Sequence, residues 1–227
     1  MNLKELDEHK IFLGSSEVKK IYLGNQVVYP HSTEPYYGSY IKMNSSDIGF
    51  DLGYYAVGSD IVKMTWYMES NIGMYYLYGS GDGSNGEKSY RLPWISSTDE
   101  LMSISLQYGQ WGNSTIYQNI SIDSLHKLLY IEVNPSLGKL ILNIGEDTFE
   151  YPFTAKTFTN STYTAWFLAV NDHGSIWRAT MDARIYDFEI VGKVHLVPYK
   201  NPSTGQSGFH DTVRNIYYYK DSYTFVS

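Results

Sequence analysis

The chain has 227 residues, of which 43% are hydrophobic and 18% charged, a composition typical of an ordered globular protein and not of a disordered or membrane protein. Its net charge of -7 argues against nucleic-acid binding, because that affinity comes largely from lysine and arginine side chains that neutralise phosphates. The absence of cysteine excludes disulfides, thiolate metal sites and a cysteine nucleophile.

The first ten residues contain neither the apolar core nor the cleavage site of a signal peptide. No apolar run approaches the roughly 18 residues that a membrane-spanning helix needs. We therefore expect a protein that is assembled in the cytoplasm and does not insert into a membrane.

Two similar segments follow, IFLGSSEV at residues 11–18 and IYLGNQVV at residues 21–28. Each predicts a strand, a tight turn and a second strand, because the Gly-Ser and Gly-Asn pairs tolerate positive φ. Isolated hairpins are marginal in water, so this segment is expected to dock on a partner. The residues predicted to carry that assembly contact are Ile11, Phe12, Leu13, Ile21, Tyr22, Leu23, Val27, Val28 and Tyr29.

A polar connector bounded by prolines comes next and cannot continue a strand ladder. It predicts three parts: an anchoring hairpin segment at residues 1–30, a linker at residues 31–35, and one large domain at residues 36–227. A sandwich of this length usually folds around a single core.

The large domain repeatedly alternates apolar and polar residues, which predicts strands. Residues 61–68 predict a half-buried strand, and residues 129–144 predict a hairpin with its turn at residues 134–138. Residues 165–170 are apolar on both faces, which predicts one central strand. Residues 186–190 alternate again, with Asp187 and Glu189 on the solvent face. The 23 tyrosines also favour strands, so we predict an all-β, antiparallel sandwich.

Two stretches at the ends of this domain resemble concanavalin-like, laminin-G-like lectin domains. The opening, YIKMN at residues 40–44 and IGFDLGY at 48–54, is similar to the family's first strands. The ending is more specific and comprises ARIYDFEI at 183–190, Asn-Pro at 201–202 and GFHDTV at 208–213. The resemblance covers residues 36–227 and implies a jelly-roll sandwich.

The segment VKKIYLGNQVVY at residues 18–29 resembles a short hairpin segment of tail, baseplate and fibre proteins of tailed bacteriophages. Together with a laminin-G-like domain, it is similar to phage virion proteins of the head-fibre, decoration or tail-fibre type. The resemblance implies other virion proteins as partners, a homo-oligomer with a trimer favoured, and a location in the virion.

Catalytic chemistry finds little support among the residues. Glucanases of the concanavalin-like fold carry paired carboxylates on one strand, and this chain offers only Glu146 and Asp147 at a turn and Asp187 and Glu189 on a solvent face. His210 next to Asp211 looks like a pair, but it matches a structural turn of the family. We expect no enzyme, no cofactor and no metal, although residues 81–86 and 171–174 are oxygen-rich loops that also describe ordinary hairpin turns.

Sugar binding uses aromatic faces beside polar groups. The candidate ligand-binding residues are Trp94, Tyr108 and Trp111, which are expected in or near loops, where sandwich packing is the competing interpretation. The sequence thus predicts a structural virion protein of a tailed bacteriophage that presents an outward lectin-like domain to host glycans. The alternatives are a bacterial, cell-associated glycan-binding lectin module and, with less support, a polysaccharide-degrading enzyme.

Overall fold

The computed structural model of the chain describes residues 12–13, 16–17, 21–23, 26–29, 39–45, 49–69, 74–81, 90–97, 101–108, 116–121, 127–154, 162–178 and 181–227. Contacts divide the chain into two units, Met1–Gly38 and Ser39–Ser227. The predicted linker at residues 31–35 lies outside the described residues. The described residues form no helix, and so none that is long and apolar enough to cross a membrane.

The first unit contains two short antiparallel hairpins. Strand β1 (Phe12–Leu13) pairs with β2 (Ser16–Glu17), and β3 (Ile21–Leu23) pairs with β4 (Gln26–Tyr29). The repeated sequence therefore forms a repeated hairpin, as predicted. All of the predicted assembly residues except Ile11, which lies outside the described residues, belong to these strands. Their contact with partners stays a prediction.

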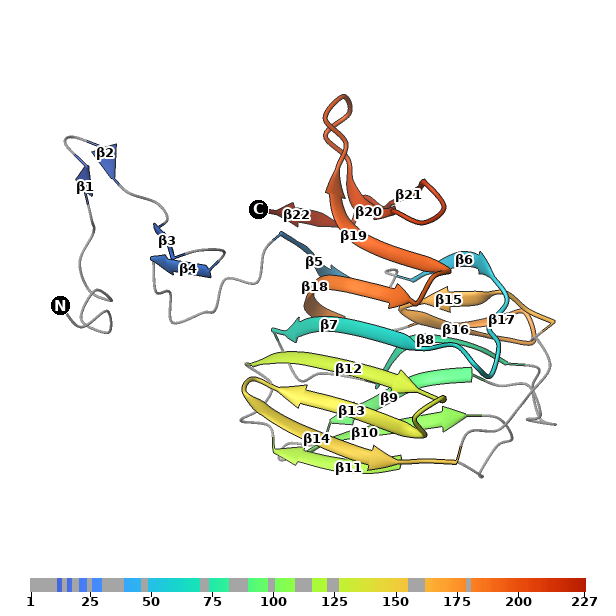
Figure 1. Ribbon diagram of the computed structural model, residues 1–227. Helices are drawn as coiled ribbons and strands as arrows, with labels where there is room; N and C mark the ends of the chain where they lie inside the picture. Colours follow the sequence, from blue (N-terminus) through green and yellow to red (C-terminus); the bar gives the residue numbers. More distant parts are fainter. Residues whose placement is uncertain are drawn as a thin grey trace. The chain divides into compact units, whose positions relative to one another are not determined.

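The second unit is a sandwich of two sheets, and its all-β fold class is as predicted (Figure 1). The first sheet has the order β11 (Ile116–Ser121), β10 (Leu101–Tyr108), β9 (Tyr90–Ser97), β8 (Met74–Gly81), β15 (Ala165–Phe167) and β6 (Phe50–Tyr54), with β16 (Ala169–Asp172) and β17 (Ser175–Arg178) attached through β8. The second has the order β14 (Asp147–Pro152), β13 (Lys139–Ile144), β12 (Leu128–Asn134), β7 (Val62–Met68), β18 (Met181–Ile190), β19 (Val194–Lys200), β20 (Ser207–Asp211) and β21 (Ile216–Tyr219), with β5 (Tyr40–Ser45) on β18 and β22 (Thr224–Val226) on β5.

Alternation along the strands builds the core between the sheets. On β7 the inward side chains of Val62, Met64, Trp66 and Met68 are each at most 1% exposed. The predicted hairpin at 129–144 is confirmed as β12 and β13, and their apolar residues alternate into the same core. Because a strand presents alternate residues to opposite faces, the local pattern was enough to assign the buried face.

Four phenylalanines join the two sheets at the centre of this core. Phe50 and Phe167 come from the first sheet, and Phe188 and Phe209 come from the second. The Phe167 ring centroid lies 5.3 Å from that of Phe50, 4.8 Å from that of Phe188 and 5.4 Å from that of Phe209. Tilted and edge-to-face rings at these distances are favourable beyond the area they bury, so this cluster fixes β6, β15, β18 and β20 against one another.

The strand predicted at residues 165–170 is interrupted, which corrects the sequence analysis. Leu168 has a φ of 52°, and the chain reverses there, so β15 runs antiparallel to β8 and β16 runs parallel to it. The Leu168 N–H donates a hydrogen bond to the Leu77 carbonyl at 2.8 Å, which holds the reversal in place. A run that is apolar on both faces predicts burial, and residues 167–170 are buried as predicted. Hydrophobicity alone does not show where a strand ends and the chain turns, so the interruption was missed.

Candidate functional site

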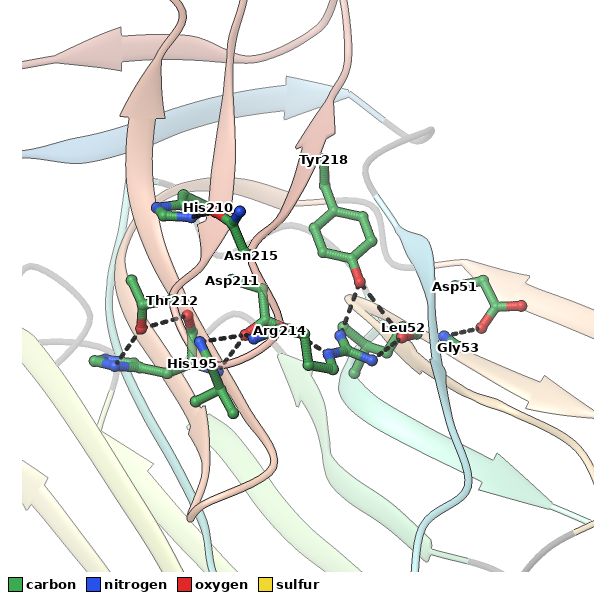
Figure 2. A network of polar contacts seen from close by, with 11 residues as sticks. Asp51, Leu52, Gly53, His195, His210, Asp211, Thr212, Arg214, Asn215 and Tyr218 are labelled. Carbon is green, nitrogen blue, oxygen red and sulfur yellow. Dashed lines mark hydrogen bonds and ion pairs between the residues drawn. The ribbon is translucent and has the colours of Figure 1, made fainter.

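The closing residues of the sandwich form a buried polar network, shown in Figure 2. The Asp211 side chain is fully buried, and its Oδ1 accepts hydrogen bonds from the backbone N–H groups of His195, Val213 and Arg214 at 3.1, 3.0 and 3.2 Å. Its Oδ2 accepts one from Arg214 Nε at 2.5 Å. The carboxylate therefore closes the turn between β20 and β21 and ties that turn to β19.

Arg214 carries this network to a distant part of the chain. Its Nη1 donates to the Leu52 carbonyl on β6 at 2.6 Å, and its Nη2 donates to the Tyr218 hydroxyl at 2.8 Å (Figure 2). Burial by itself raises the pKa of the Asp211 carboxyl, but the hydrogen bonds from Arg214 and from the backbone outweigh burial and hold that pKa below its ordinary value. The Asp211–Arg214 ion pair is thus a structural element that connects the turn after β20 to β6.

His210 does not form a catalytic pair with Asp211. Its side chain lies on the opposite face of β20, where Nε2 is 3.1 Å from Asn215 Oδ1 and the ring stacks on Tyr217. Since adjacent strand residues point to opposite faces, sequence neighbours here cannot share a proton. The motif therefore has a structural role, but residues 208–211 belong to strand β20, and the turn begins only after Asp211.

Three of the carboxylates on the outer face of the second sheet are Glu132, Glu189 and Asp187, and each has a partner of its own. Glu132 on β12 accepts hydrogen bonds from Tyr130 and Asn134 at 2.8 and 2.9 Å. Glu189 on β18 lies 3.6 Å from Lys63 Nζ. Both of these carboxylates therefore have a contact within the sheet. Glu146 and Asp147 are exposed at the start of β14, as predicted.

The third of these carboxylates, Asp187, pairs with a histidine. Its Oδ1 is 2.7 Å from His195 Nε2, and His195 Nδ1 is 3.2 Å from the Thr212 hydroxyl. Burial raises the pKa of the Asp187 carboxyl above its ordinary value, and the hydrogen bond from His195 offsets this only in part. These three side chains link β18, β19 and the turn after β20.

The described residues hold no group of three or more histidine, aspartate or glutamate side chains that would bind a metal ion. In the oxygen-rich loop at residues 171–174, the Asn171 side chain accepts a hydrogen bond from the Gly174 N–H at 2.9 Å, so it closes the turn between β16 and β17. The other such loop lies outside the described residues, except for Gly81 at the end of β8.

Two of the predicted sugar-binding residues, Trp94 and Tyr108, lie in strands. Trp94 is in the middle of β9, where its backbone pairs with Tyr76 and Ser105, and Tyr108 is the last residue of β10. Trp111 lies outside the described residues. The expectation of loop positions is therefore wrong for Trp94, because β9 runs without interruption from Tyr90 to Ser97. Ligand binding by these residues stays a prediction.

The structure assembles another aromatic surface, on the outer face of β19, β20 and β21. Tyr199, His210, Tyr217 and Tyr219 all lie there, and we call them the aromatic platform. From the sequence, His210 was considered only as a neighbour of Asp211, and the three tyrosines were not singled out. In the sequence, the alternation of Tyr217 and Tyr219 already indicated that these two rings share one face of a strand. The rings of Tyr199 and His210 join them only because β19, β20 and β21 pair in this register.

No protein-family model matches this chain, and no curated protein matches it. Several solved structures are similar in fold. The CBM40 of the Ruminococcus gnavus IT-sialidase bound to alpha2,3 sialyllactose is 9% identical, with a TM-score of 0.43, over 64% of this chain and 87% of that chain. Domains LG4-5 of the mouse laminin alpha1 chain are 11% identical, with a TM-score of 0.44, over 83% of this chain and 46% of that chain.

The full extracellular region of zebrafish Gpr126/Adgrg6 is 12% identical, with a TM-score of 0.47, over 83% of this chain and 26% of that chain. At TM-scores below 0.5, these likenesses carry no argument about function. The fold class of this chain follows from its own two sheets.

Proposed function

We propose that this chain is a structural protein of a tailed-bacteriophage virion. In this proposal the N-terminal hairpins attach it to other virion proteins, and the sandwich is presented outward as a non-catalytic, lectin-like domain that binds host surface glycans. The observation that carries the proposal is the division of the chain into a unit of two tandem hairpins and a separate sandwich.

The hairpin unit supports an assembly role on physical grounds. Each hairpin in the described residues is a two-stranded sheet of its own, with two to four residues per strand. Such hairpins bury too little apolar surface to be stable alone, so they require a further surface to pack on. The resemblance of this segment to hairpins of phage tail and fibre proteins suggests what supplies that surface.

The sandwich supports a binding role and not a catalytic one. Among its described carboxylates, Asp211, Asp187, Glu132 and Glu189 each have a partner within the sandwich. A trimer is the oligomer we favour, because joining several copies multiplies weak glycan contacts through effective concentration.

Mass spectrometry of purified phage particles tests the virion assignment. The chain is expected in washed particles, and a variant that lacks residues 1–30 is expected to be lost from them while its sandwich still folds. Absence of the full-length chain from particles would contradict the assignment. Binding of the full-length chain to a glycan array tests the lectin-like role separately.

A further inference from the structure

The aromatic platform arises from the register of three neighbouring strands. His210 on β20 pairs with Tyr217 on β21, while Gly208 lies between Tyr199 on β19 and Tyr219 on β21. The missing side chain at Gly208 leaves no obstacle between these two tyrosines, whose ring centroids are 6.3 Å apart. Strand pairing thus brings four rings onto one face of the sheet.

The rings form an ordered surface. The His210 and Tyr217 rings are stacked, with centroids 4.3 Å apart and planes 5° apart. The Tyr217 and Tyr219 rings are parallel within 6° at 6.2 Å, and Tyr199 leans on Tyr217 at 4.9 Å. Rings that support one another lose little conformational entropy when a ligand contacts them.

These rings are not needed by the core. The inward residues of the same strands serve it: Phe209 is fully buried, and Tyr218 stacks on Phe50 at 4.3 Å. By contrast Tyr217 is 42% exposed, and β21 is the last strand of its sheet. A cluster of aromatic side chains on a solvent-facing surface is typical of an interaction site.

The polar groups at the platform indicate what it binds. Desolvation, together with the neighbouring Tyr217 and Tyr219, raises the pKa of the Tyr199 phenol, as expected for hydroxyls that lie close together. Asn201 Nδ2 is 3.4 Å from the Tyr219 hydroxyl, and Asn215 Oδ1 is 3.1 Å from His210 Nε2. None of the four aromatic side chains and two asparagines at the platform carries a carboxylate, an ammonium or a guanidinium group.

The geometry points to the aromatic platform as a binding site for a neutral saccharide, whose C–H faces contact the tyrosine rings while its hydroxyls bond the phenol and amide groups. This inference rests on the glycan-binding role in the proposed function. A saccharide has apolar C–H faces and polar hydroxyl groups. It therefore binds well to a rigid aromatic surface that also presents a few oriented polar groups. An acidic saccharide is disfavoured, because the platform contains no lysine or arginine and the chain has a net charge of -7.

The test measures binding of the full-length chain to cellohexaose, maltohexaose and mannohexaose, with sialyllactose and polygalacturonate as acidic probes, by titration calorimetry. At least one neutral hexasaccharide is expected to bind. Tyr217→Ala and Tyr219→Ala should each weaken that binding about tenfold, as expected for aromatic anchors. Tyr217→Phe, which keeps the ring, should lose about threefold or less. Tyr55→Ala is the matched control, because Tyr55 is 49% exposed and directly follows β6, which belongs to the other sheet.

Each contrary outcome separates this inference from the function it rests on. If the chain binds a neutral hexasaccharide and both alanine variants bind it equally well, the platform is not the site, although the glycan-binding role stands. Binding of acidic probes alone would overturn the neutral-saccharide assignment. If no probe binds, the lectin-like role itself fails. If Tyr217→Ala converts an oligomer into a monomer by molar-mass measurement, the platform is a contact between copies of this chain.

Discussion

Replacing Arg214 with methionine is expected to destabilise the sandwich by about 4 kcal/mol at pH 7. Asp211 is fully buried, and Arg214 is its charged partner, so Arg214→Met leaves a buried carboxylate without a counter-charge, at a cost of about 3 kcal/mol. The hydrogen bonds from Arg214 to the Leu52 carbonyl and the Tyr218 hydroxyl are also lost, which adds about 1 kcal/mol.

Guanidinium titration with tryptophan fluorescence measures this change, because all five tryptophans lie in the unit Ser39–Ser227. A double variant, Asp211→Asn with Arg214→Met, should be about 1–2 kcal/mol more stable than Arg214→Met alone, since it removes the unpaired charge. The control is Lys139→Met. Lys139 and Glu150 pair at 2.6 Å with side chains 45% and 51% exposed, so breaking that pair should cost less than about 1 kcal/mol.

The pH dependence provides an independent check on Arg214→Met. Because the folded-state pKa of Asp211 is lowered, its stabilising contribution is present above the unfolded pKa of about 3.9 and is lost as the pH falls through the folded value. The gap between wild type and variant should therefore shrink below about pH 4. A cost no larger than that of Lys139→Met, or a gap that does not change with pH, would refute the reasoning.

Three further changes test the core, the platform turn and the Asp187 pair. Phe167→Ala, at the centre of the aromatic cluster, should cost about 3–5 kcal/mol in the same titration, and a loss below about 1 kcal/mol would contradict that packing. In Gly208→Ala the new Cβ would meet a backbone carbonyl oxygen of β21 at 1.9 Å, so thermal denaturation should show a larger loss than in Gly192→Ala, where only a φ of +70° resists the side chain. Asp187→Asn should be more stable than wild type at pH 7. The reason is that burial raises the folded-state pKa of Asp187, so the free energy that this carboxyl contributes to folding is lost as the pH rises through that pKa. The stability advantage of Asp187→Asn over wild type should therefore disappear below about pH 4, where the carboxyl is protonated in both the folded and the unfolded state. A variant that is less stable than wild type at pH 7 would show that the contact with His195 dominates.

Local patterns determined much of this protein. The alternation in residues 62–68 and 129–144 was enough to predict β7, β12 and β13 and to say which residues face the core. The repeated segments at 11–18 and 21–28 were enough to predict two hairpins. These features are set by neighbours along the chain, because a period of two residues and a glycine-containing turn are both local properties.

Tertiary structure decided what lies beside what. Arg214 reaches the Leu52 carbonyl across 162 residues, and no local pattern indicates that contact. The reversal at Leu168 depends on a hydrogen bond to β8, which is distant in sequence. The aromatic platform exists only because the register of β19, β20 and β21 places Tyr199 and His210 on the same face as Tyr217 and Tyr219. Alternation fixes the face of each residue within its own strand, whereas a surface made from several strands depends on their pairing and register, which are long-range properties of the folded chain.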